Sequence, residues 1–103
     1  AGAELEIEWS LAEPAMFDPE AAPLRLARGA LARACGAEPA LLRMGGTLPL
    51  LSALADRGIP AIVTGFVVPD DEIHAPNESF RLEALELGER AARELYAALA
   101  ALR

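Results

Sequence analysis

The sequence predicts an α/β fold, in which a parallel βαβ unit flanked by helices forms part of a three-layer α/β/α domain. Two apolar runs, residues 40–44 and 60–68, have the composition of strands that are covered on both faces. A helical pattern between them makes them consecutive strands of a right-handed crossover, and therefore parallel. The chain has 103 residues, which is the length of one domain, and its 53% hydrophobic composition is ample for a core.

A further strand is expected near the N-terminus. Residues 4–9 alternate glutamate with apolar side chains, so one face would be wet and the other would bury Leu5, Ile7 and Trp9. A strand with one polar face suits an antiparallel sheet outside the βαβ unit. Residues 12–23 then carry three prolines and little periodic apolar sequence, which indicates a linker between two structural units.

The first predicted helix spans about residues 22–35. Pro23 suits the first turn of a helix, and Gly36 can adopt the left-handed conformation that ends one. Apolar side chains recur between them at helical spacing, at Leu24, Ala27, Leu31 and Ala34.

Two more helices follow the two central strands. The second begins at Thr47, which can cap it, and ends before Gly58, with an inner face of Leu50, Leu51 and Leu54. The third is capped by Ser79 and carries apolar or small residues spaced three and four apart, at Leu85, Gly88, Ala92, Leu95, Leu99 and Leu102. Two parallel strands are a small platform for three apolar helix faces, so we expect further strands and helices to complete the sheet.

Composition argues against two classes of partner. The net charge is −7 and all nine basic residues are arginine, whereas phosphate-backbone binding needs a basic face, so we expect no nucleic acid. No apolar run approaches the roughly 20 residues of a membrane span, so we expect no membrane partner. Cys35 is the only cysteine, which favours a buried structural thiol and a reducing, cytoplasmic compartment.

The only histidine, His74, lies in a loop after the second central strand, beside Asp70, Asp71, Glu72 and Glu78. Acidic loop residues are most simply solvated, and one histidine cannot make a metal site. The loop nevertheless follows the carboxyl end of a strand, where α/β sheets gather their ligands and catalytic residues. His74 is therefore a candidate metal ligand.

Residues 43–49, from Arg43 to Pro49, form the second candidate. Gly45 and Gly46 allow close backbone approach just before a helix, where amide groups can hold a carboxylate or an oxyanion, although a Gly-Gly pair can also be only a tight turn. Because this loop also follows a parallel strand, we expect it at the same sheet edge as His74, where both could serve one site.

Four features in this order resemble the dinuclear zinc metallopeptidases, a family that includes aminoacylases, carboxypeptidase G, succinyl-diaminopimelate desuccinylase and carnosinase-like dipeptidases. They are Arg43-x-Gly-Gly-Thr-Leu-Pro, a hydrophobic strand ending in Gly65-Phe66, the motif Pro69-Asp-Asp-x-Ile-His-Ala-Pro-Asn-Glu, and a long helix. The resemblance covers most of the chain and is greatest to the dipeptidase branch.

The resemblance implies that the chain is the C-terminal segment of such an enzyme. Residues 1–11 would be the last strand of the lid and dimerisation domain, residues 12–22 the crossover linker, and residues 23–103 the C-terminal part of the α/β catalytic domain. The N-terminal part of the enzyme would supply the remaining metal ligands and the glutamate base. The parent would be a homodimer, and this chain alone would be inactive.

The resemblance also implies roles for individual residues. His74 would bind zinc, with two ions in the full-length enzyme and cobalt or manganese as substitutes. Gly46 and Thr47, with Arg43, would contact the substrate carboxylate. Asn77 and Glu78 would shape the loop that carries the metal ligand.

The substrate class stays open between a dipeptide and an N-acyl amino acid. Met44 stands where dipeptidase-like members often carry an acidic residue, and Thr47-Leu48 replaces the commoner Ser-Ile. Two alternatives to this assignment also stay open. One is a noncatalytic α/β interaction module that docks a partner through its leucine stripe. The other is a fragment that assembles with a separately encoded N-terminal half.

Overall fold

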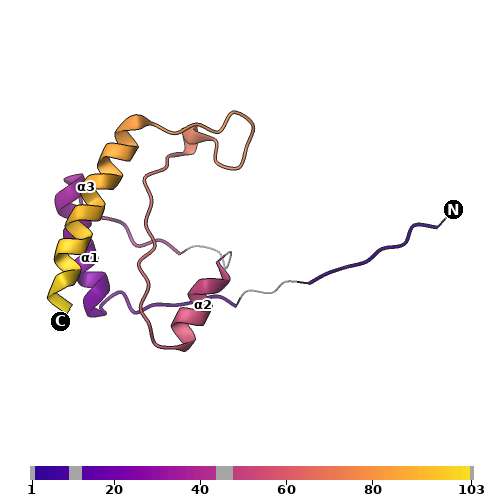
Figure 1. Ribbon diagram of the computed structural model, residues 1–103, viewed down its shortest axis with the longest axis horizontal. Helices are drawn as coiled ribbons and strands as arrows, with labels where there is room; N and C mark the ends of the chain where they lie inside the picture. The colour runs from indigo at the N-terminus through magenta and orange to yellow at the C-terminus, as the bar shows by residue number, and fades with distance from the viewer. Residues whose placement is uncertain (1, 10–12, 44–47, 103) are drawn as a thin grey trace.

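A computed structural model describes residues 2–9, 13–43 and 48–102 of the chain (Figure 1). Its helices are α1 (Ala22–Cys35), α2 (Pro49–Asp56) and α3 (Leu82–Leu99), with the short 3₁₀ helices η1 (Pro69–Asp71) and η2 (Ala100–Leu102). None of the described residues forms a β-strand. The predicted α/β fold class, with its parallel βαβ unit, is therefore wrong for this structure.

The core lies where α1 and α3 pack side by side, running in opposite directions (Figure 1). α1 buries Ala27, Ala30, Leu31 and Ala34, which recur at the spacing of one helix face. Ala84 and Ala91 are the buried residues of α3. Phe66 and Leu95 pack against the cluster of Leu31, Ala34 and Ala91. Small side chains let the two helices approach closely, but they bury little apolar area.

The bounds of α1 confirm the predicted helix over residues 22–35. Proline occupies its first turn, and Gly36 follows it in the left-handed conformation, with φ 71°. The Gly36 N–H donates to the carbonyl of Ala32, which satisfies one of the last carbonyl groups of the helix. Cys35 is exposed, contrary to the predicted buried thiol, because it lies one residue beyond the buried stripe.

The other helices begin differently from their predictions. The predicted cap of α2, Thr47, lies outside the described residues, and Leu48 is the N-cap residue. α2 has no buried residue, and Leu50 of its predicted inner face is 68% exposed. The N-cap residue of α3 is Arg81, so the prediction that Ser79 caps this helix is wrong.

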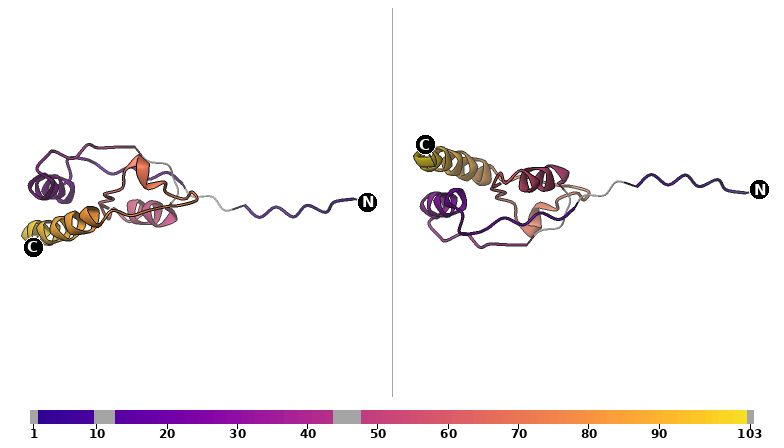
Figure 2. Two further views of the ribbon diagram at one scale, coloured as in Figure 1. Left: turned by 90° about the horizontal axis from the view of Figure 1, so that it is seen from above. Right: turned by 90° about the horizontal axis from the view of Figure 1, so that it is seen from below.

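The three predicted strands are extended or irregular chain without sheet partners. Residues 2–9 run away from the helices and are exposed (Figure 2). Residues 40–43 are exposed, and Met44 of the same predicted strand lies outside the described residues. Residues 60–68 pass along α3 instead of pairing with a neighbour. A strand is completed only by the backbone groups of an adjacent strand, and none of the described segments supplies them.

Much apolar surface is consequently uncovered. The chain exposes 8601 Å², whereas a compact protein of its mass exposes about 5500 Å². Its radius of gyration is 17.7 Å, against about 13 Å for a compact domain of this length. Large apolar side chains such as Trp9, Leu42 and Leu82 are more than three-quarters exposed. Among the described helices, none combines the length and apolar character needed to cross a membrane.

Candidate functional site

Residues 68–81, here called the histidine loop, connect the extended segment 60–68 to the start of α3. The loop projects sideways from the N-terminal end of α3, away from the helix pair (Figure 1). Most of its side chains are exposed, including that of His74. With little apolar contact to hold it, its conformation depends on its own hydrogen bonds.

Asp71 is the centre of these hydrogen bonds and is only 2% exposed. Its backbone N–H donates to the carbonyl of Val68 at 3.0 Å, and the Val68 N–H donates to Asp71 Oδ2 at 2.9 Å. This reciprocal pair closes η1, as in helix starts where an acidic third residue reaches back to the capping residue. The expectation that Asp71 is a solvated loop carboxylate is wrong, because the backbone and Arg81 enclose it.

Arg81 holds the other side of the Asp71 carboxylate. Its Nε donates to Asp71 Oδ1 at 3.3 Å, and its Nη2 donates to the carbonyl of Phe66 at 3.1 Å. The Ser79 N–H donates to the carbonyl of Asp71 at 3.0 Å. These bonds join the two ends of the loop, because Phe66 precedes it and Arg81 is the residue from which α3 begins.

The part of the loop between Asp71 and Ser79, here called the excursion, consists of two successive turns. The Ala75 N–H donates to the carbonyl of Glu72 at 3.0 Å, and the Glu78 N–H donates to the carbonyl of Ala75 at 3.3 Å. His74 and Asn77, each the third residue of its turn, have φ 61° and φ 66°. Positive φ at this position is characteristic of type II turns, and Pro76-Asn77 is a preferred central pair for one.

His74 thus presents an exposed imidazole from a left-handed backbone position. The carboxylates of Asp70, Glu72 and Glu78 in the same loop are exposed as well, which gives the loop a negative potential that favours a cation. No three His, Cys, Asp or Glu side chains in the described ranges are grouped closely enough to hold a metal ion. The donor chemistry of His74 fits one position of a zinc coordination shell, and the chain's described part does not complete that shell.

The structure brings only some of the predicted site residues together. His74, Asn77 and Glu78 share the histidine loop. Arg43 is exposed in a different segment, and Gly46 and Thr47 lie outside the described residues. The sheet edge at which we expected the two loops to meet is not formed by the described residues, because they contain no strand.

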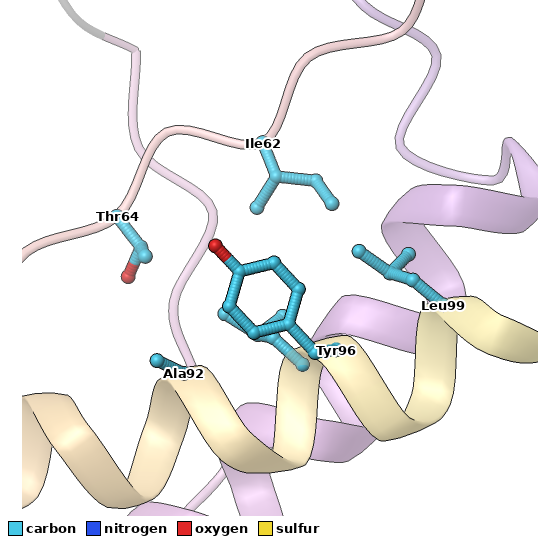
Figure 3. Close-up of a pocket in the computed structure, with 6 residues that line it drawn as sticks. Ile62, Thr64, Ala92, Tyr96 and Leu99 are labelled. Atoms are coloured by element: carbon cyan, nitrogen blue, oxygen red, sulfur yellow. The ribbon is translucent and has the colours of Figure 1, made fainter.

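An apolar groove lies between the extended segment 60–68 and α3, with a volume of about 320 Å³. It is lined by Ile62, Thr64, Ala92, Leu95, Tyr96 and Leu99. The Tyr96 ring extends from α3 toward the segment, with its hydroxyl oxygen between Thr64 and Ile62 (Figure 3). The lining contains no carboxylate, histidine or arginine, and Thr64 and Tyr96 supply its polar side chains.

Asp71 and Arg81 are the residues of this site that sequence reasoning missed. An acidic residue three positions after Val68, with Pro69 at the start of η1, is a local signal that could have identified the Asp71 cap. The pairing with Arg81 has no such signal, because it spans ten residues across an irregular loop.

No protein-family model, curated protein sequence or solved structure matches this chain.

Proposed function

We propose that this chain is the C-terminal segment of a zinc-dependent metallopeptidase or amidohydrolase and that His74 is one of its metal ligands. The proposal is carried by one observation: an exposed histidine is held at φ 61° in a loop that is closed around a buried carboxylate. A left-handed conformation costs a non-glycine residue about 1 kcal/mol, and such residues gather at functional sites.

The surroundings of His74 support a cation as its ligand. Three exposed carboxylates in the same loop attract positive charge, and neutral imidazole is a common zinc ligand. The motif that contains His74 is also one of the two motifs that together resemble the dinuclear zinc metallopeptidases. The chemistry that two bound zinc ions, or cobalt or manganese in their place, supply in such enzymes is the activation of water and the polarisation of an amide carbonyl.

The rest of the metal site is assigned to the N-terminal part of the same enzyme. The uncovered apolar surface of this chain supports such a partner, because exposed leucines and a tryptophan are stabilised by burial against other elements. That part would supply the other metal ligands and the glutamate base, and the parent would be a homodimer. The single cysteine agrees with a cytoplasmic location.

The remaining site residues are assigned to the substrate and to the loop. Gly46 and Thr47, together with Arg43, bind the carboxylate of a dipeptide or an N-acyl amino acid. A guanidinium and backbone amide groups are suitable donors for that carboxylate. Asn77 and Glu78 shape the turns that present His74.

The test is His74→Ala in the full-length protein that contains this chain, with Asp56→Asn, outside the histidine loop, as the control. His74→Ala is expected to lose zinc and to reduce hydrolysis of dipeptides and N-acyl amino acids at least about 100-fold, because a metal ligand is removed. Asp56 is exposed at the end of α2, and its variant should retain both properties. Zinc content by elemental analysis and steady-state turnover are the measurements.

The competing function, a noncatalytic interaction module, predicts a different result. If His74→Ala keeps the zinc content and the turnover of the unmodified protein, His74 is only a structural loop residue and the proposed function is wrong. A circular dichroism spectrum of each variant would establish that the loss of zinc does not come from unfolding.

A further inference from the structure

We infer that Asp71, together with Arg81, is the positioning residue of the His74 metal ligand. The inference rests on the proposed function. In it, the buried Asp71 carboxylate holds the loop in the conformation that positions the exposed His74 imidazole. Asp71 is not itself available as a ligand, because both of its carboxylate oxygens accept hydrogen bonds and the residue is 2% exposed.

Asp71 is suited to this task because its polar groups bind both ends of the loop. Oδ2 accepts from the Val68 N–H and Oδ1 accepts from Arg81 Nε. The backbone carbonyl accepts from the Ser79 N–H, while the backbone N–H donates to the Val68 carbonyl. One residue therefore fixes the entry of the loop, its exit and the residue from which α3 begins.

The His74 backbone has few other constraints. Residues 72–74 and 76–78 are exposed, and only Ala75 of the excursion is half-buried. The two turns set the local conformation of His74, but the described contacts that orient these turns relative to α3 run through Asp71 and Arg81. Loss of the Asp71 side chain would leave the turns intact and let them move as a unit.

Such a displacement would weaken metal binding without removing the ligand. Groups that orient a metal-binding histidine without touching the metal change metal affinity by about 10–100-fold when they are removed. The defect should therefore differ in kind from the loss of His74. Excess zinc should restore turnover to the Asp71 variant, and it should not restore turnover to His74→Ala.

The experiment compares Asp71→Ala, Asp71→Asn and Asp56→Asn in the full-length protein that contains this chain. Hydrogen exchange measured by mass spectrometry reports the Val68 and Ser79 amides, and competition with a chelator gives the zinc affinity. Asp71→Ala is expected to exchange at least about tenfold faster over residues 68–80, because the bonds that close the loop are lost. Its zinc affinity should fall about 10–100-fold.

The two remaining variants provide an intermediate case and a control for hydrogen exchange and zinc affinity. Asp71→Asn retains one side-chain acceptor for two donors and should lie between Asp71→Ala and the unmodified protein in both measurements. Asp56→Asn makes the same chemical change at an exposed residue outside the loop and should alter neither. Unchanged exchange over residues 86–98 of α3 would show that the Asp71 variants remain folded.

The outcomes separate this inference from the function on which it rests. Faster exchange in the loop with unchanged zinc affinity would make Asp71 merely structural and would overturn the inference, as would native exchange rates in Asp71→Ala. Both results leave the function intact as long as His74→Ala loses zinc. Retention of zinc by His74→Ala would overturn the function and the inference together.

Discussion

The pair formed by α1 and α3 is held by apolar side chains, whereas the histidine loop is held by hydrogen bonds that converge on one carboxylate. In the helix pair, Leu31, Ala34 and Ala91 exclude water from a continuous contact. In the loop, Asp71 is the buried residue, and the amides of Val68 and Ser79 point to it. The two regions meet at Arg81, where α3 begins.

This difference in stabilising interactions determines how each region should unfold when it is disrupted. Apolar burial is spread over many atoms and both helices, so its disruption should unfold the pair as a unit. The loop depends on a few directional bonds, so its disruption should stay local. The distinction also suits the proposed function, since a ligand loop can be adjusted without cost to the core if the two regions are energetically separate.

The largest expected effect comes from placing a charge in the helix contact. Ala91 is 1% exposed and packs in the Leu31 cluster, so Ala91→Glu overfills the contact and buries an unpaired carboxylate. We expect the free energy of unfolding to fall by at least about 3 kcal/mol. Because the core is small, this should abolish most of the helical circular dichroism signal.

Ala97→Glu is the matched control, since Ala97 is exposed on the same helix. It should change the free energy of unfolding by no more than about 0.5 kcal/mol. Equal loss of helicity in both variants would mean that α1 and α3 do not pack through the face that contains Ala91.

An intermediate effect is expected from the bond that links α3 to the end of α1. Arg90 Nε donates to the carbonyl of Ala34 at 3.0 Å, one of the last carbonyls of α1, where a cation also complements the helix dipole. Arg90→Met keeps much of the side-chain length and removes the donor. We expect a loss of about 1–2 kcal/mol in thermal unfolding experiments.

Arg33→Met provides the comparison for this prediction. Arg33 pairs with Glu94 at 2.9 Å across the same helix contact, but their side chains are 58% and 40% exposed. Such a pair contributes about 0–1 kcal/mol and is weakened by salt. If Arg33→Met destabilised the chain more than Arg90→Met at high salt, the cap at Ala34 would not be the stronger link.

The same division explains which parts of the fold could be predicted from the sequence. The predicted bounds of α1, about residues 22–35, agree with the structure because its signals are local, namely a proline in its first turn, apolar residues at helical spacing, and a glycine directly after it. The prediction of a strand at residues 60–68 was wrong because a nearly continuous apolar run with β-branched residues indicates which side chains avoid water, but it does not supply the neighbouring strand. Phe66 instead packs against the helix-pair core.

The site shows a similar limit. The sequence singled out His74 as the only histidine in a proline-containing loop, and the Pro76-Asn77 pair is a recognisable turn signal. It did not reveal that the Ser79 N–H would donate to the carbonyl of Asp71 or that α3 would begin after Arg81, because both depend on how the loop closes and not on local sequence. The pairing of Arg81 with Asp71 likewise depends on how the loop folds and not on the residues adjacent to Arg81 in the sequence.

The smallest change in the free energy of global unfolding is expected from substitutions in the histidine loop. Such substitutions test whether the loop and the helix pair unfold separately. Asn77 has φ 66°, so Asn77→Ala should destabilise the turn by about 1 kcal/mol, whereas Asn77→Gly should not, because glycine adopts this conformation freely. Hydrogen exchange of residues 72–80 should accelerate in the alanine variant alone. The free energy of global unfolding should change by less than about 0.5 kcal/mol in both variants, because Asn77 is exposed and the loop can open while the helix pair stays folded. If Asn77→Ala instead lowered the melting temperature as much as Arg90→Met, the loop and the helix pair would unfold as one cooperative unit, and Asp71 would serve the core as well as His74.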